Sequence, residues 1–266
     1  MSHSQRKPRG RAEVVIFGRR TVLEAFELPS VTVNAVRLGD AVPATYRKRL
    51  GAACEKSEVE LDIVPMREVG RWSHEPKHDQ GVAARVTLGQ VSDVNDWTSA
   101  LGAGLTNELL RVVALDHVTN PQNVGMIVRA AAAFGIDAML WPTQGVPWME
   151  GLVIKASAGT ALRIPIATCR TAAEGIIVLQ NKGFRAVGLD GSSEQAIGEF
   201  DAPRRVVLVL GEENDGLTMP TKAVLDLTAR IEIEQGVESL NVATAAAVAC
   251  YALTRNLRAG SSLPRA

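Results

Sequence analysis

Alternating apolar and polar positions organise the first third of this 266-residue chain. Between residues 14 and 88 the pattern predicts strands and helices in turn. The expected strands span 33–38, 60–64 and 82–86, and the expected helices span 19–27, 44–55 and a short segment after Pro65. Such a unit belongs to the α/β class and has about the smallest size that buries its own core.

Strand-like apolar runs continue in the rest of the chain. They span 111–115, 138–141, 163–167, 185–189, 205–210 and 229–233. Helical stretches separate them, which is typical of a mostly parallel sheet covered on both faces. Between the two units, residues 89–108 mix Gly, Ser, Asp, Asn and Thr with little periodicity and are predicted to be a linker. We therefore expect a basic tail (1–13), a small α/β domain (14–88), the linker and a larger domain (109–260).

Three polar blocks follow strand-like runs of the larger domain, and an open α/β sheet binds ligands at the carboxyl ends of its strands. In the first block, Asn123 and Gly125 lie in the first turns of a predicted helix. Arg129 follows nearly two helical turns later, so both polar side chains can point toward one end of the sheet. An arginine suits phosphate binding because its planar fork stays charged. Helix capping by Asn123 and a surface ion pair of Arg129 are the simpler interpretations of this block alone.

The second and third blocks combine backbone access with polar groups. Gly211 ends an apolar strand, and Glu213 follows in a turn that Gly216 closes. Glycine lets a ligand approach the backbone, and a carboxylate at a strand end is a candidate functional group. Ser239 and Asn241 open a small-residue helix, where they can act as caps and leave backbone amides near a small ligand. Turn chemistry and capping explain each block equally well when it is taken alone.

Charge and cysteine usage narrow the class of protein. The formal net charge is zero, but six basic residues stand against one acid between Arg6 and Arg20, and a second basic group lies at 47–49. Such groups are usually solvated surface, and they are also typical of RNA-binding arms. The three cysteines lie far apart without C-x-x-C spacing, which favours neither disulfides nor a zinc site and fits a cytoplasmic protein.

Membrane, metal and dinucleotide sites are not predicted. No apolar run approaches the roughly 20 residues that span a bilayer. His74 and His78 have the i,i+4 spacing of a metal pair, but Pro76 between them argues against a helix, so we expect no metal. The chain also has no G-x-G-x-x-G fingerprint and no P-loop, which argues against a nucleotide-binding oxidoreductase.

The three blocks together resemble, in their order and near their separations, the motifs of the SpoU-type (TrmH-like) RNA ribose 2'-O-methyltransferases. This family belongs to the knotted SPOUT superfamily, and the resemblance covers roughly Val112 to Asn256. Residues 15–25 also resemble the start of the family's small RNA substrate-binding domain. The resemblance implies a trefoil knot near the C-terminus, S-adenosylmethionine as cofactor, an RNA substrate and a homodimer that completes each active site across its interface.

The resemblance also implies two sets of site residues. The catalytic and substrate-orienting set comprises Asn123, Arg129, Glu213, Ser239 and Asn241. The cofactor-binding set comprises Leu210, Gly211, Ile231, Leu240 and Asn241. The chain departs from the family pattern at Glu232 and Ile233, where a Pro-Met pair is usual, and in the acidic, bulkier residues Glu212, Asn214 and Asp215.

The expected reaction transfers a methyl group from S-adenosylmethionine to a ribose 2'-hydroxyl. Ribosomal RNA, 23S RNA in particular, is favoured because the N-terminal domain resembles that of the ribosomal-RNA members. A transfer-RNA enzyme and a non-catalytic binder of structured RNA are the alternatives. An arginine guanidinium stays protonated and is therefore a poor base, so we expect Arg129 to clamp phosphate and to stabilise the developing alkoxide. Asn123, Glu213, Ser239 and Asn241 would orient it and the ribose.

Overall fold

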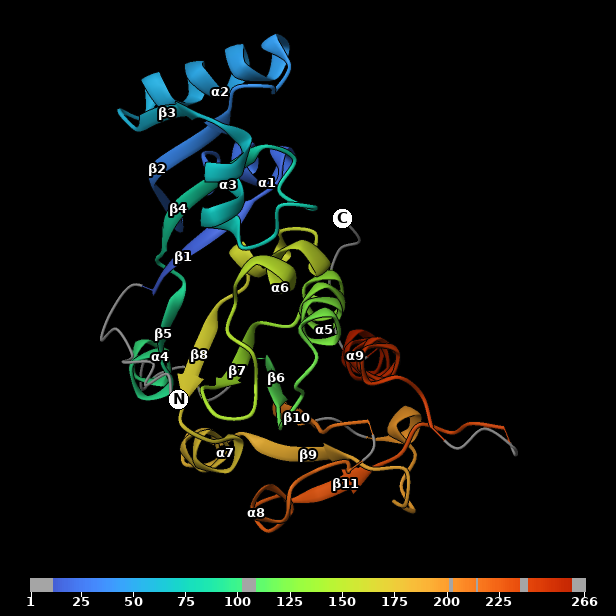
Figure 1. Ribbon diagram of the computed structural model, residues 1–266. Coiled ribbons are helices and arrows are strands. Elements are labelled where there is room, and N and C mark those ends of the chain that lie inside the picture. The colour runs from blue at the N-terminus through green and yellow to red at the C-terminus, as the bar shows by residue number, and fades with distance from the viewer. Residues whose placement is uncertain (1–11, 102–108, 201–202, 214, 235–238, 260–266) are drawn as a thin grey trace.

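A computed structural model describes residues 12–101, 109–200, 203–213, 215–234 and 239–259 (Figure 1). These residues form two sheets, a small one near the N-terminus and a larger one that follows it. Residues 1–11 of the predicted basic tail and Asn214 lie outside the described residues.

The first sheet is mixed and has four strands. Its order is β1 (Ala12–Phe17), β4 (Val82–Leu88), β2 (Val31–Gly39) and β3 (Glu60–Val64). Helices α1 (Arg19–Ala25) and α2 (Ala44–Lys56) cover one face, and α3 (Met66–Ser73) covers the other. Alternation along β1 assigns its side chains to two cores: Val14 and Ile16 pack with the α1 and α2 side, and Val15 and Phe17 pack with the α3 side.

The second sheet has seven strands, and all of its pairings are parallel. Its order is β11 (Leu227–Ala229), β9 (Arg185–Leu189), β10 (Arg205–Leu210), β6 (Leu110–Leu115), β7 (Ala138–Pro142), β8 (Ile166–Cys169) and β5 (Val91–Asp93). The central strands are apolar on both faces because helices bury both of them. The prediction of an α/β protein with a mostly parallel sheet is confirmed.

Helices cover the second sheet on opposite sides. One face packs against α5 (Pro121–Ala133), α6 (Gly151–Ala156) and α9 (Val242–Ala259), and the other against α4 (Val94–Ala100) and α7 (Ala172–Gln180). Short elements complete the unit: α8 (Met219–Lys222), η1 (Thr160–Leu162) and η2 (Ile197–Glu199). In Figure 1, α5 and α9 lie side by side, and they are in direct contact.

The strand order creates a switch point between β6 and β10. From β6 the chain builds outward through β7 and β8, and then returns to place β9 and β10 on the opposite side of β6. The segments that follow β6 and β10 therefore lie next to each other at the carboxyl edge of the sheet, which is where open α/β sheets bind ligands. The second polar block lies in the loop after β10, and the first block lies in α5, directly after the loop that follows β6.

Three predictions about local structure were wrong. Residues 91–100 of the expected linker form β5 and α4, because β5 pairs with β8 and the helix buries Val94 against the sheet. The strand expected over 229–233 ends at Ala229, and the strand expected over 163–167 begins only at Ile166.

In the described part of the chain, no helix is both long and apolar enough to cross a membrane.

Candidate active site

The first turn of α5 presents Asn123 at the switch point. Asn120 caps α5: its Oδ1 accepts hydrogen bonds from the backbone nitrogens of Gln122 (2.9 Å) and Asn123 (3.4 Å). Pro121 occupies the first turn, where its missing N–H costs nothing. Because Asn120 performs the capping, the side chain of Asn123 is free for another partner. The capping role that the sequence left open for Asn123 belongs to Asn120.

The loop after β10 is a tight hairpin that carries Glu213. Glu212 and Gly216 exchange two backbone hydrogen bonds of 3.0 Å each. A Cβ atom at Gly211 would overlap the carbonyl group of Gly216 and would lie 2.6 Å from the nitrogen of Leu217. Glycine is therefore the residue that allows the loop to fold back directly from the strand.

The start of α9 supplies the third component. Asn241 caps the helix, since its Oδ1 accepts hydrogen bonds from the backbone nitrogens of Ala243 (3.0 Å) and Thr244 (3.3 Å). The predicted capping by Asn241 is confirmed. Its amide Nδ2 therefore points away from the helix and is available as a donor.

These three components meet at the Glu213 carboxylate. Its Oε1 accepts hydrogen bonds from Asn123 Nδ2 (2.9 Å), from the backbone nitrogen of Val242 (3.2 Å) and from Asn241 Nδ2. Asn241 Nδ2 also contacts Asn123 Oδ1 at 3.1 Å. We call Asn123, Glu213 and Asn241 the polar cluster. Segments that are 90 and 118 residues apart in sequence are thus joined at one edge of the sheet.

The Glu213 carboxylate has no cationic partner among the described residues. Three donors converge instead on its Oε1 at the start of α9, where the helix dipole is positive. Glu213 is exposed, and its Oε2 accepts no hydrogen bond from the described part of the chain. This oxygen is therefore directed to solvent or to a bound molecule, and the oriented amides can fix a polar group beside it.

Arg129 does not join the polar cluster. It is exposed on α5 and lines a hollow with Ala132, Ala133, Ile136, Thr160, Arg163, Ile164 and Pro165. Ile136 and Pro165 precede β7 and β8, so this hollow lies toward the amino ends of the strands. The expectation that Asn123 and Arg129 point toward the same end of the sheet was wrong, because two helical turns carry Arg129 past the cluster. Its functional role stays a prediction.

Leu210 is the last residue of β10, and the other predicted site residues lie beyond strand ends at the carboxyl edge. Gly211 follows β10, Ile231 follows β11, and Leu240 precedes Asn241. Ile231 and Leu240 are half-buried, whereas the side chain of Leu210 is buried in the core, so Leu210 can offer only its backbone to a ligand. Ser239 is exposed and lies outside the polar cluster.

Sequence reasoning missed a second group of polar residues at this edge. Asp116 directly follows β6 and bonds Thr218, and Thr119 Oγ1 donates a hydrogen bond of 3.0 Å to Glu212 Oε1. The latter contact explains one departure from the family pattern, since Glu212 has a partner in the β6–α5 turn. The available signal in the sequence was an aspartate directly after an apolar strand.

In the described residues, no group of three or more His, Cys, Asp or Glu side chains is arranged to hold a metal ion.

Fold and site together define the class of the protein. It is an α/β protein with a parallel larger sheet and a polar, glycine-containing candidate ligand site at the switch point of that sheet.

Comparison with known proteins identifies the family. Residues 110–251 match the SpoU rRNA Methylase family. The chain is 30% identical to an uncharacterized tRNA/rRNA methyltransferase of Mycobacterium ulcerans, over 96% of this chain and 82% of that protein. It is 37% identical to the 23S rRNA (guanosine-2'-O-)-methyltransferase RlmB of Xylella fastidiosa, over 66% of this chain and 70% of that protein. The chain belongs to the SpoU rRNA methylase family, and it is an RNA methyltransferase.

A solved structure supports the fold over nearly the whole chain. The SpoU methyltransferase AviRb from Streptomyces viridochromogenes, crystallised in complex with AdoMet, superposes with a TM-score of 0.78. The match covers 94% of this chain and 92% of AviRb at 20% sequence identity. Similarity at this level of identity concerns the fold.

Gly211→Ala is expected to reduce both stability and activity. The added methyl group overlaps the Gly216 carbonyl, so the hairpin must move, at a cost of about 1–3 kcal/mol in the free energy of unfolding. Gly51→Ala is the matched control, because a Cβ on this α2 residue meets nothing within 4 Å. Denaturant unfolding and methyl-transfer assays on both variants test this. Wild-type activity in a stable Gly211→Ala protein would show that the hairpin tolerates a side chain.

Proposed function

We propose that the protein methylates a ribose 2'-hydroxyl of 23S ribosomal RNA and uses S-adenosylmethionine as methyl donor. The polar cluster at the switch point is the observation that carries the proposal, because it combines a carboxylate with oriented amides beside a glycine loop. Membership of the SpoU family and the similarity to RlmB of Xylella fastidiosa support ribosomal RNA and the 2'-hydroxyl.

The residues at the carboxyl edge fit the proposed cofactor. Gly211 has no side chain to block the strand end, and the half-buried Ile231 and Leu240 offer apolar contacts for the adenine ring. Backbone groups in these segments supply the hydrogen bonds of a nucleoside site. When bound, S-adenosylmethionine supplies an electrophilic methyl group on its sulfonium.

The chain's own residues would position the acceptor. Glu213 holds the amides of Asn123 and Asn241, and this rigid arrangement can orient the ribose for in-line attack. Arg129 would bind the phosphate next to the target ribose and stabilise the charge that develops on its oxygen. Ser239 stays in this orienting set as a prediction.

A homodimer would bring Arg129 to a polar cluster. Helices α5 and α9 expose apolar side chains: Met126 on α5 is 43% exposed, and Val248 and Tyr251 on α9 are 40% and 52% exposed. Exposed apolar side chains concentrated on two adjacent helices favour an interface with a second copy. Since Arg129 is remote from the cluster of its own protomer, we propose that it acts in the active site of the partner. Light scattering should then report a dimer.

The N-terminal unit would bind the RNA. Trp72 lies beneath the guanidinium groups of Arg37 (4.1 Å to the ring centroid) and Arg85 (4.8 Å). A groove between the two units is lined by Trp72 and Arg85 and, from the larger unit, by Pro121 and Trp148. Aromatic rings and guanidinium planes are the surfaces on which unpaired RNA bases stack. We retain residues 14–88 as the proposed substrate-binding domain, and the trefoil knot stays a prediction.

Methyl transfer from labelled S-adenosylmethionine to unmodified ribosomal and transfer RNA tests the function. We expect label on a single, alkali-resistant ribose of 23S RNA, and at least about a 100-fold lower rate with Asn123→Ala because the cluster loses its central amide. Label on transfer RNA alone would replace the proposed substrate with the alternative one. Absence of label on either RNA, with cofactor bound, would favour a non-catalytic role.

A further inference from the structure

We propose that Asp116 is a positioning residue that holds the Glu213 hairpin in register with the polar cluster. Asp116 directly follows β6, and its side chain is only 3% exposed. It touches neither Asn123 nor Glu213 through a hydrogen bond, so its influence on the site must pass through the backbone of residues 211–218. The inference concerns the same site as the proposed function and rests on it for the effect on catalysis.

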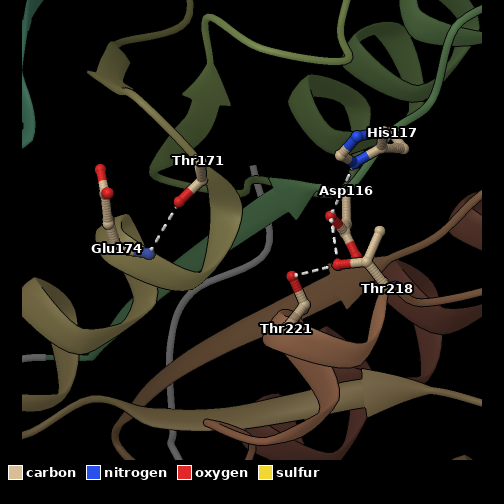
Figure 2. Close-up of polar contacts among 6 residues, drawn as sticks. All are labelled: Asp116, His117, Thr171, Glu174, Thr218 and Thr221. Carbon is tan, nitrogen blue, oxygen red and sulfur yellow. Dashed lines mark hydrogen bonds and ion pairs between the residues drawn. The ribbon is translucent and has the colours of Figure 1, made fainter.

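Both carboxylate oxygens of Asp116 accept hydrogen bonds from Thr218, at the far end of the hairpin. The backbone nitrogen of Thr218 donates to Oδ2 at 2.7 Å, and Thr218 Oγ1 donates to Oδ1 at 3.3 Å. Figure 2 shows the contact between Asp116 and the Thr218 hydroxyl, and the neighbouring hydrogen bond between the hydroxyls of Thr218 and Thr221, which is 3.1 Å long. His117 Nδ1 lies 3.3 Å from Oδ1 on the opposite side. Asp116 thus connects β6 to a segment 102 residues away.

The hairpin is tied to the β6–α5 segment at three points. At its near end, the backbone nitrogen of Asp116 donates to the carbonyl of Leu210 at 2.8 Å. In the middle, Glu212 accepts the hydroxyl of Thr119. At its far end, Thr218 bonds Asp116. Because Asn123 belongs to the same segment, these ties fix Glu213 relative to the amide that it binds.

A carboxylate suits this arrangement because it accepts on both oxygens, and Thr218 presents two donors. An asparagine would keep one acceptor for the Thr218 backbone nitrogen and would turn its Nδ2 toward the Thr218 hydroxyl, which can also accept. It would therefore replace the charge-assisted hydrogen bonds of Asp116 with weaker neutral ones. Burying a charge is costly unless it is hydrogen-bonded in this way. The hydrogen bonds that Asp116 accepts are also charge-assisted, which makes them stronger than bonds between neutral groups.

Asp116→Asn is expected to lower kcat about 10- to 100-fold, because misplacement of a reacting group by an ångström has effects of this size. The KM for RNA should change by less than about threefold, because the substrate surfaces are untouched. In a Glu213→Gln background, adding Asp116→Asn should change kcat by less than about twofold, since both substitutions act through one group. If the fold-reductions in kcat caused by the two single substitutions multiplied in the double variant, the two residues would act independently, and the proposal would be overturned.

Amide hydrogen exchange of Val242 gives a readout that needs no activity. This amide is bonded to Glu213 Oε1, so retraction of the hairpin should accelerate its exchange about tenfold or more in Asp116→Asn. Asp137→Asn is the matched control: Asp137 Oδ2 accepts the backbone nitrogen of Arg111 at 2.7 Å, at the opposite edge of the sheet. That variant should leave Val242 exchange and kcat unchanged. Unaltered Val242 exchange in Asp116→Asn would overturn the proposal, whereas failure of the wild type to methylate RNA would overturn only the proposed function.

Discussion

Glu213→Gln is expected to lower kcat for RNA methylation by about 100-fold, with little change in the folded structure. Glu213 Oε1 accepts hydrogen bonds from Asn123, Asn241 and the backbone nitrogen of Val242. The glutamine keeps the shape but removes the charge that holds these donors, and hydrogen bonds to charged groups contribute about 1.5–3 kcal/mol. Loss of orientation at a reacting centre has a similarly large effect on rate. Steady-state kinetics with kcat and KM measured separately provide the test.

Asp215→Asn is the control for this experiment. Asp215 is an exposed carboxylate in the same hairpin, two residues beyond Glu213. Its substitution removes the same charge from the same loop, so it should change kcat by less than about twofold, as expected for surface sites. If Glu213→Gln retained full activity, the polar cluster would be a structural cap of α9, and the site would have to be sought elsewhere.

Mixing two inactive variants, Arg129→Ala and Glu213→Ala, is expected to restore activity. If Arg129 acts across the interface, each mixed dimer has one site with both substitutions and one site with neither. Random exchange of subunits makes about half of the dimers mixed, so the mixture should recover about a quarter of wild-type activity. Each variant alone should have at most about a hundredth of the wild-type activity. Activity is measured after the two proteins are unfolded and refolded together.

The control mixture combines Glu213→Ala with Asn241→Ala. Both residues belong to the polar cluster of one protomer, so every site in a mixed dimer lacks one of them. This mixture should stay inactive whether or not Arg129 crosses the interface. Equal inactivity of the Arg129→Ala mixture would assign Arg129 to the site of its own protomer, and the dimer proposal would then lose its functional argument.

Much of the fold could be predicted from the sequence because it depends on local patterns. The strands over 185–189 and 205–210 were predicted with the limits that the structure shows, since each is an apolar run between polar turns. The capping role of Asn241 was also readable, because a cap acts on backbone groups only two or three residues away. By contrast, β5 was missed because its three residues become a strand only through pairing with β8.

By itself, the sequence determined the α/β class, the order of most elements and the residue types at the strand ends. Spacing within one segment is a local property, so Asn123, Glu213 and Asn241 could be singled out as candidates. Only the tertiary structure decided which of them meet. The parallel order β10–β6 brings Glu213 to Asn123, and two turns of α5 carry Arg129 away from both. The contact of Asp116 with Thr218 joins residues 102 positions apart. Such a contact forms only when the chain folds, so a local sequence pattern cannot predict it.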